Sequence, residues 1–296
     1  MLNSPHVPRS TTTVILDCMR RIIAVLGGFP GDAARWAQCR KEAGEVMAQV
    51  KEELDFRQGD RRGSFRTVAV GTSYGGGQRC PGILRHSARN AAACAKLIAS
   101  QAINRIAGFG SSLFAFYAPK MYRDYATKLD KLYDHYPDLD YLWNASIFPC
   151  ASFNFGPNAL CVEHNDHGNR AAGWCSIFCD GTFDPTHGGH LILRQLGIVV
   201  ESPPGSTVLI PSACITHGNT AIGKGETRWS FTQYASGGLF RFIEYGFRTW
   251  REVELGDTAF ADELRAQRET RWASELALLS QVDKVATDRE AAGLLS

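Results

Sequence analysis

The stretch CVEHNDHGNR, from Cys161 to Arg170, places two histidines, one aspartate and two asparagines within ten residues. His164 and Asp166 are two positions apart, so on an extended segment their side chains project to the same side and can occupy neighbouring corners of one metal ion. The same spacing arises often by chance, because a surface histidine beside a solvated aspartate needs no metal. A metal site therefore requires further ligands elsewhere in the chain.

The region around this motif, from about residue 147 to 245, has a sequence pattern typical of β-structure. Short apolar runs rich in β-branched and aromatic residues alternate with glycine, proline, asparagine and aspartate. Several short strands at such spacing are typical of an all-β sandwich or barrel. We therefore expect a β-barrel core in this region.

Helical segments are expected on both sides of the barrel, because apolar residues recur there with a period near 3.6. A strand is also expected in SFRTVAVG (64–71), before the inserted helices. The expected helices cover about 12–26, 31–55, 88–106, 119–136 and the last fifty residues, with a disordered leader at 1–10 and a polar turn at 57–64.

Composition gives broad limits on the function. The chain has 296 residues, 44% of them hydrophobic, and a formal net charge of +2, which neither requires nor excludes a nucleic-acid partner. Its nine cysteines are scattered and odd in number, which indicates reduced thiols and an intracellular protein. The apolar stretch at 13–28 is interrupted by Asp17, Arg20 and Arg21, so we expect a soluble protein without a signal sequence or a membrane span.

A third metal ligand is available at His217, which ends a β-type run containing a proline–serine turn. Strands that intervene between Asp166 and His217 can return the chain across a barrel. Two histidines and one carboxylate with open positions opposite them form the facial triad of non-haem Fe(II) oxygenases. Zinc binds the same ligands, so these residues alone do not determine which metal is bound.

Arg228 lies on the next β-type run, and Ser230 shares its face. An arginine inside a barrel is costly unless it meets an anion, and its planar fork suits a carboxylate. The order H-x-D, H and R-x-S suits Fe(II) together with 2-oxoglutarate, whose keto acid would take two metal positions and whose far carboxylate would meet Arg228 and Ser230. Asn154 is a further inward polar candidate, since a polar residue on a barrel strand needs a partner.

These motifs resemble the Fe(II)- and 2-oxoglutarate-dependent dioxygenases, and in particular the fungal branch of the TET/JBP family of nucleic-acid methylbase oxidases. HNDHGN (164–169) is similar to the family's H-x-D-x-x-N, and RWSFTQY (228–234) resembles R-x-S-x-x-x-Y. Five further stretches resemble the local sequences of the fungal members: SYGGGQ, FNFGPN, FDPTHGGHL, PPGSTVLIPSA and SFTQYASGGLFR. The resemblance covers roughly residues 66–246.

The resemblance implies an α+β fold with a double-stranded β-helix core, of the jelly-roll or cupin-like type, flanked by N- and C-terminal helices. The expected units are an N-terminal helical extension (1–62), the dioxygenase domain with inserted helices (63–250) and a C-terminal helix (251–296). The metal ligands and catalytic residues would be His164, Asp166 and His217, and the 2-oxoglutarate contacts would be Arg228, Ser230 and Asn154.

The resemblance also implies a pocket for a flipped base. Asn169 would hydrogen-bond the base and Tyr234 would stack on it. Ser236 occupies the position at which animal TET enzymes carry a histidine that contacts the base edge, so the preferred base stays open. His167, beside the ligands, is counted with the substrate-binding residues, and a place next to the metal or simple solvation are the alternatives.

The glycine-rich loop GTSYGGGQRCPG (71–82) is either a flexible surface loop or a loop held against a ligand. Arg241 is expected in an ion pair at the rim, with a phosphate contact as the alternative. His187 and His190 are expected in a turn rather than at a second metal. The DNA contacts expected from the glycine loop and its basic neighbours are Gly76, Gly77, Gln78, Arg79 and Arg85.

The expected activity is oxidation of a methylated base flipped out of duplex DNA, with Fe(II), 2-oxoglutarate and O2, and with ascorbate as a stimulant. The substrates would be 5-methylcytosine, oxidised to 5-hydroxymethylcytosine and beyond, or N6-methyladenine, which would be demethylated. Such a substrate implies a nuclear protein without membrane contact, although the sequence has no convincing basic import signal. Two alternatives stay open: a dioxygenase of the same fold acting on RNA, a nucleoside, a small molecule or a protein, and an inactive barrel that binds DNA or a partner.

Overall fold

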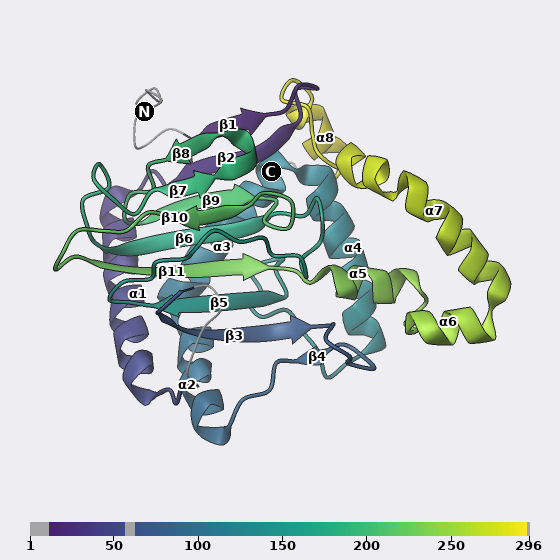
Figure 1. Cartoon of the computed structure of the whole chain (residues 1–296), viewed down its shortest axis with the longest axis horizontal. Coiled ribbons are helices and arrows are strands. Elements are labelled where there is room, and N and C mark those ends of the chain that lie inside the picture. The colour runs from purple at the N-terminus through teal and green to yellow at the C-terminus, as the bar shows by residue number, and fades with distance from the viewer. Residues whose placement is uncertain (1–11, 57–62, 295–296) are drawn as a thin grey trace.

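The computed structural model describes residues 12–56 and 63–294, which form two antiparallel sheets and a set of covering helices (Figure 1). The larger sheet has eight strands in the order β1-β2-β9-β6-β11-β5-β3-β4, and the smaller has three in the order β10-β7-β8. The strands are β1 (Thr13–Leu16), β2 (Ile22–Gly28), β3 (Arg66–Ser73), β4 (Gly82–Ile83), β5 (Cys150–Phe155), β6 (Cys175–Thr182), β7 (Leu191–Leu193), β8 (Ile198–Val200), β9 (Ser206–Ile210), β10 (His217–Asn219) and β11 (Thr227–Tyr234).

Alternation along the central strands separates the core from the site. Phe153, Phe178 and Phe231, on β5, β6 and β11, are buried in one cluster on the helix-covered face. Their strand neighbours Asn154 and Ser230 project to the opposite face, since successive side chains of a strand alternate. The pairing register places Ser230 directly opposite Asn154. The large sheet is therefore apolar toward the helices and polar toward the site.

Four helices cover the apolar face of the large sheet (Figure 1): α1 (Ala33–Glu53), α2 (Ala88–Ala99), α3 (Gln101–Tyr117) and α4 (Pro119–His135). The Asp32 side chain caps α1 by accepting from the Arg35 N–H, which satisfies a donor that the helix leaves unpaired. Gly110 brings α3 against the sheet, because a Cβ at this position would lie 2.1 Å from the Ser176 hydroxyl oxygen on β6. The helix could not pack this closely with a larger residue there.

The helix expected at 12–26 is wrong. β1 and β2 form a hairpin there, and β2 pairs with β9 in the large sheet. The Asp17 carboxylate accepts from the backbone N–H groups of Met19 and Arg21, and Arg20 has φ 61°, which together make the turn. The β-branched residues on each side of this turn favour strands over a helix.

Other helical expectations stand with adjusted bounds. Those at 31–55 and 119–136 are confirmed as α1 and α4. The single helix expected at 88–106 is two helices, because Ser100 ends α2 and its hydroxyl caps α3 by accepting from the Ile103 N–H. The leader at 1–10 and most of the polar turn at 57–64 lie outside the described residues. The proposed division of the chain at residues 62 and 250 stays a prediction.

The range expected for the C-terminal helix (251–296) contains three helices: α6 (Trp250–Gly256), α7 (Thr258–Ala277) and α8 (Val285–Ala291). A further helix, α5 (Gly237–Glu244), precedes them. Figure 1 shows α7 running along the outside of the molecule from α6 to α8. α8 packs against α3 and α4, so the chain returns to the body after α7. None of the helices in the described ranges is both long and apolar enough to span a membrane.

All nine cysteines lie within the described ranges, and none of them is joined to another by a disulfide. Burial raises the pKa of Cys94 to about 11 and that of Cys150 to about 12. Because the thiolate is the reactive form, these two should resist a disulfide reagent such as dithionitrobenzoate at pH 8. We expect only the exposed Cys18, Cys80 and Cys214 to react in the native protein, and all nine after denaturation in guanidinium. Rapid reaction of more than three native thiols would contradict this packing.

Candidate metal centre

Two segments bring the proposed ligands together on the face of the large sheet opposite the helices. His217 begins β10, which pairs with β7 in the small sheet. His164 lies in an irregular segment rather than on a regular strand, but it exchanges two backbone hydrogen bonds with His217, each 2.9 Å long. Asp166 is held by its own N–H, which donates to the Ser212 carbonyl at 3.0 Å. The segment with the H-x-D motif therefore extends the small sheet along β10.

The three side chains converge as a metal site requires. The Nε2 atoms of His164 and His217 lie 3.7 and 3.8 Å from the two carboxylate oxygens of Asp166. One ligand atom from each residue falls within 4.8 Å of the others, and no other such cluster occurs in residues 12–56 and 63–294. These separations suit three ligands of one ion.

Each histidine is oriented by a backbone carbonyl. Nδ1 of His164 lies 2.8 Å from the Val162 oxygen, and Nδ1 of His217 lies 2.9 Å from the Ile215 oxygen. A carbonyl oxygen can only accept, so both Nδ1 atoms carry the proton and both Nε2 lone pairs face Asp166. Metal-binding histidines are commonly fixed in this way through their second nitrogen. The donor set therefore fits Fe(II), and it also fits zinc.

Arg228 provides a buried cation without a counter-ion. It is 4% exposed, and its Nη1 donates to the Ala159 carbonyl at 2.9 Å. Its buried Nε has no hydrogen-bond partner, and no carboxylate of the described chain pairs with this guanidinium. A buried guanidinium in this state is costly unless an anion binds it. The site therefore fits a ligand with a carboxylate directed at Arg228.

A hydrogen-bonded chain of three side chains crosses β3, β5 and β11 beside Arg228. The Thr67 hydroxyl donates to Oδ1 of Asn154 at 3.0 Å, and Nδ2 of Asn154 donates to the Ser230 hydroxyl oxygen at 2.8 Å. Because Ser230 accepts this bond, its own O–H is left to donate toward an anion at Arg228. Asn154 thus orients Ser230, and its direct contact with 2-oxoglutarate stays a prediction.

The cavity that joins these groups, called here the metal pocket, is about 50 Å³ in volume. Residues that sequence analysis had not singled out also line it, among them Thr232 and Asn219. Both lie two positions after predicted residues and so share their strand faces. Asn219 accepts from the Cys161 N–H at 2.9 Å, which fixes the H-x-D segment to β10. The lining residues are Asn154, Cys161, His164, Asp166, Ile177, Leu191, His217, Gly218, Asn219, Arg228, Ser230 and Thr232.

The four residues predicted for base recognition are not among those that line the metal pocket. The Asn169 amide donates to the Ser212 hydroxyl at 3.1 Å and to the Cys175 sulfur at 3.2 Å. Ser236 caps α5, and its hydroxyl donates to the Tyr74 carbonyl at 2.6 Å. Tyr234 shares the face of Arg228 and Ser230 on β11, whereas His167 is exposed. Their roles in base recognition stay predictions.

The glycine-rich loop is shorter than expected, because 71–73 belong to β3 and 82 belongs to β4. Gly76, Gly77 and the cations Arg79 and Arg85 are exposed, and the glycines have positive φ angles of 58° and 90°. The Gln78 side chain accepts from the Gly75 N–H at 3.1 Å and holds the turn. The loop is therefore accessible to a ligand, and its contact with DNA stays a prediction.

The turn expected at His187 and His190 is confirmed. His187 is exposed and lies 2.9 Å from the Asp184 carboxylate, while Nε2 of His190 contacts the Pro185 carbonyl at 2.8 Å. The two histidines therefore use their ring nitrogens within the turn. They do not join the metal cluster found in the described chain.

Comparison with known proteins gives a fold but no sequence family. No family model and no curated protein matches the chain. Among solved structures, NgTET1 in complex with 5mC DNA aligns over 77% of each chain at 15% identity, with a TM-score of 0.51. A Pseudomonas putida prolyl-4-hydroxylase aligns over 68% of this chain and 87% of its own at 16% identity and TM-score 0.34. An oxidoreductase of the 2OG-Fe(II) oxygenase family from Burkholderia pseudomallei aligns over 70% and 92% at 13% identity and TM-score 0.35. The similarity to NgTET1 therefore shows a fold of mixed helices and antiparallel strands, with a double-stranded β-helix core.

Proposed function

We propose that the protein is an Fe(II)- and 2-oxoglutarate-dependent dioxygenase that oxidises a methylated base in DNA. The observation that carries the proposal is the combination, in one pocket, of a His-Asp-His set and a buried arginine whose Nε lacks a partner. A metal alone would need only the first of these. A co-substrate with a distant carboxylate needs both.

In this proposal His164, Asp166 and His217 hold Fe(II), and Arg228 with Ser230 holds the far carboxylate of 2-oxoglutarate. When bound, the iron and the keto acid supply the oxidising chemistry, which consumes O2 and releases succinate and CO2 as the substrate gains one oxygen atom. The chain contributes orientation: two backbone carbonyls fix the imidazoles, and Asn154 fixes the Ser230 hydroxyl. This arrangement positions the co-substrate before a C–H bond is presented.

A substitution at Thr67, whose hydroxyl donates to Asn154, tests this role of Asn154. Thr67→Val removes the donor that fixes the Asn154 amide, so the amide can turn and compete for the Ser230 hydrogen. We expect the KM for 2-oxoglutarate to rise about tenfold with little change in kcat, since one hydrogen bond to a charged ligand is at stake. Steady-state succinate release would measure both constants, and Thr67→Ser should restore the wild-type KM. A lower kcat at unchanged KM would contradict the proposed orientation.

The substrate class rests on the motifs and on the fold. A base within a duplex cannot reach iron buried in a barrel, so it would have to be flipped out. The H-x-D-x-x-N and R-x-S-x-x-x-Y motifs assign Asn169 and Tyr234 to the flipped base, and exposed Arg79 and Arg85 flank the loop assigned to the opened duplex. The fold similarity to NgTET1, solved with 5mC DNA, supports this class. Local sequence similarity to the fungal TET/JBP members supports the narrower assignment to that branch. A DNA substrate would in turn imply a nuclear location.

A second substrate class is favoured by one observation. Asn169 and Ser236 both use their side chains inside the fold, on Ser212 with Cys175 and on the Tyr74 carbonyl respectively. If these bonds persist with substrate bound, neither side chain can read a base edge. The same oxidising centre would then act on a small molecule or a protein, because RNA and nucleosides also present a base edge.

Mass spectrometry of duplex oligonucleotides tests the proposal. Separate duplexes carrying 5-methylcytosine, N6-methyladenine or thymine would be incubated with the protein, Fe(II), 2-oxoglutarate and ascorbate, which keeps iron reduced. Oxidised or demethylated base is expected in one duplex with the wild type and with His187→Ala, an exposed histidine outside the pocket, but not with His217→Ala. Succinate release without base change would retain the dioxygenase and assign another substrate. Absence of both products from metal-loaded protein would leave an inactive barrel that binds DNA or a partner.

A further inference from the structure

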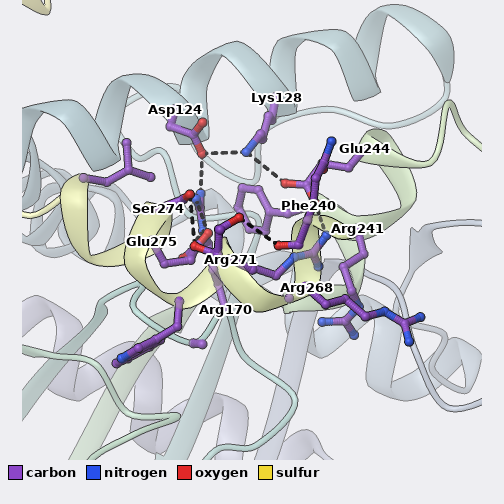
Figure 2. A pocket seen from close by; sticks show the side chains of 16 residues that line it. Asp124, Lys128, Arg170, Phe240, Arg241, Glu244, Arg268, Arg271, Ser274 and Glu275 are labelled. Atoms are coloured by element: carbon purple, nitrogen blue, oxygen red, sulfur yellow. Dashed lines mark hydrogen bonds and ion pairs between the residues drawn. The ribbon is translucent and has the colours of Figure 1, made fainter. Parts of the chain in front are cut away.

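A cavity beside the C-terminal helices (Figure 2) shares no lining residue with the metal pocket. Its volume is about 580 Å³, within the range of small-molecule sites. We call it the arm cavity, because α7 forms one wall while α4, α5 and the segment after the H-x-D motif form the others. Its lining residues are Asp124, Lys128, Arg170, Ala171, Gly237, Phe240, Arg241, Glu244, Gln267, Arg268, Thr270, Arg271, Trp272, Ser274, Glu275 and Leu278.

The three carboxylates of the arm cavity are already neutralised. Each of them, from Asp124, Glu244 and Glu275, is bound by at least one of three cations, as the dashed lines in Figure 2 show. The ion pairs are Arg170–Asp124 at 2.5 Å, Arg170–Glu275 at 2.7 Å, Lys128–Asp124 at 3.0 Å, Lys128–Glu244 at 3.1 Å and Arg271–Glu244 at 3.2 Å. This network holds α4, α5 and α7 in place around the cavity.

Two further cations of the lining, Arg241 and Arg268, have no carboxylate partner within the part of the chain that the structure describes. The ion pair expected for Arg241 is therefore not found. Its Nη1 lies instead against α5, 3.2 Å from the position that a Cβ on Gly237 would take. Arg268 lies over the Trp250 ring at 4.7 Å, a contact that leaves its N–H groups free to bind. The lining thus carries two positive charges in excess.

One part of the remaining lining is apolar. Phe240, Trp272 and Leu278 border the cavity, and Trp272 is 49% exposed although it is a large aromatic side chain. A cavity with two free guanidinium groups and an aromatic wall suits a ligand with a charged head and an apolar body. A bare inorganic anion would leave the apolar wall uncovered.

We propose that the arm cavity binds a small organic dianion, either a phosphate monoester or a dicarboxylate, whose head group meets Arg241 and Arg268 and whose apolar body covers Trp272. Guanidinium groups bind both head groups bidentately, so the two sources share one recognition chemistry. A phosphate monoester is close to doubly charged above pH 7, which matches the excess charge of the lining. The site shares no residue with the metal pocket and goes beyond the proposed enzymatic function.

Calorimetric titration with two probes, phenyl phosphate and benzylsuccinate, tests the proposal at pH 7.5 on protein without added metal. At least one probe should bind the wild type, and which one binds identifies the head group. Arg241→Ala and Arg268→Ala should each weaken binding about tenfold, since each removes charge-assisted hydrogen bonds. Arg251→Ala is the matched control, because this exposed arginine on α6 does not line the cavity, and it should bind like the wild type.

A dicarboxylate probe could also enter the metal pocket, so the titration is repeated with Arg228→Met. Unchanged binding is expected there, whatever the outcome for the oxygenase activity. Loss of binding in Arg228→Met with retention in Arg241→Ala and Arg268→Ala would place the probe in the metal pocket and overturn the proposal. Binding of neither probe by the wild type would overturn it as well. Both cavity arginines are exposed, so unchanged melting temperatures should show that the variants fold.

Discussion

Replacing Asp166 with alanine is expected to abolish metal binding and to lower turnover more than a thousandfold. Asp166 is the only anionic member of the cluster, and its two oxygens lie 3.7 and 3.8 Å from the two Nε2 atoms. Without it, two neutral imidazoles would have to hold a divalent ion alone. A metal centre stabilises a transition state by several kcal/mol, and about 4 kcal/mol corresponds to a thousandfold in rate.

Metal affinity should be measured together with succinate release, so that binding and turnover are separated. Asp184→Ala is the matched control, because Asp184 also pairs with a histidine, at 2.9 Å from His187, but lies in an exposed turn. We expect Asp184→Ala to bind metal and to turn over like the wild type. Full metal occupancy and full turnover in Asp166→Ala would show that the His-Asp-His cluster is not the reaction centre.

Two pairs of residues in the metal pocket could be predicted from sequence because the signal of each pair is local. His164 and Asp166 share a face at a spacing of two residues, and Arg228 shares one with Ser230 in the same way. These short-range relations hold even though the H-x-D segment is irregular, since two backbone hydrogen bonds to His217 keep it extended. The identity of the ligands thus depended little on the exact secondary structure.

The hairpin of β1 and β2 shows why local patterns fail elsewhere. Its short apolar runs fit a helical period as well as a strand, and only the β-branched residues and the turn at Asp17 distinguish the two. The chain formed by Thr67, Asn154 and Ser230 could not be predicted for a different reason. It depends on the register among β3, β5 and β11, which a single sequence does not specify.

The C-terminal helices raise the same difficulty at longer range, because the ion pair between Arg170 and Glu275 joins residues 105 positions apart. Arg170 is 4% exposed and lies over the Tyr125 and Phe240 rings at 5.1 and 4.5 Å. Burial alone would lower the pKa of this guanidinium, but the bonds from Glu275 and the nearby Asp124 more than offset it and raise the pKa. The arginine therefore stays charged in a nearly dry environment.

Replacing Arg170 with methionine is expected to destabilise the protein by about 2–3 kcal/mol. Methionine keeps the contact with the rings, but it leaves Glu275 without a counter-charge and removes one of the two cations at Asp124. Removing one partner of a buried pair costs about 3–5 kcal/mol, and the partial exposure of the two carboxylates reduces this cost. Thermal unfolding should show a melting temperature lower by roughly 3–5 °C.

Arg265→Met is the control for loss of an arginine, because Arg265 lies on α7, the helix that carries Glu275. The ion pairs of Arg265 with Asp262 and Glu254 are exposed, so their loss should destabilise the protein far less than the loss of Arg170. The double variant Arg170→Met/Glu275→Leu should regain part of the lost stability, because it removes the carboxylate that Arg170→Met leaves unpaired. If the double variant is less stable than the sum of the single changes, the cost does not arise from an uncompensated charge. The buried arginine would then act mainly through the cation–π contacts of its guanidinium with Tyr125 and Phe240, which methionine cannot make.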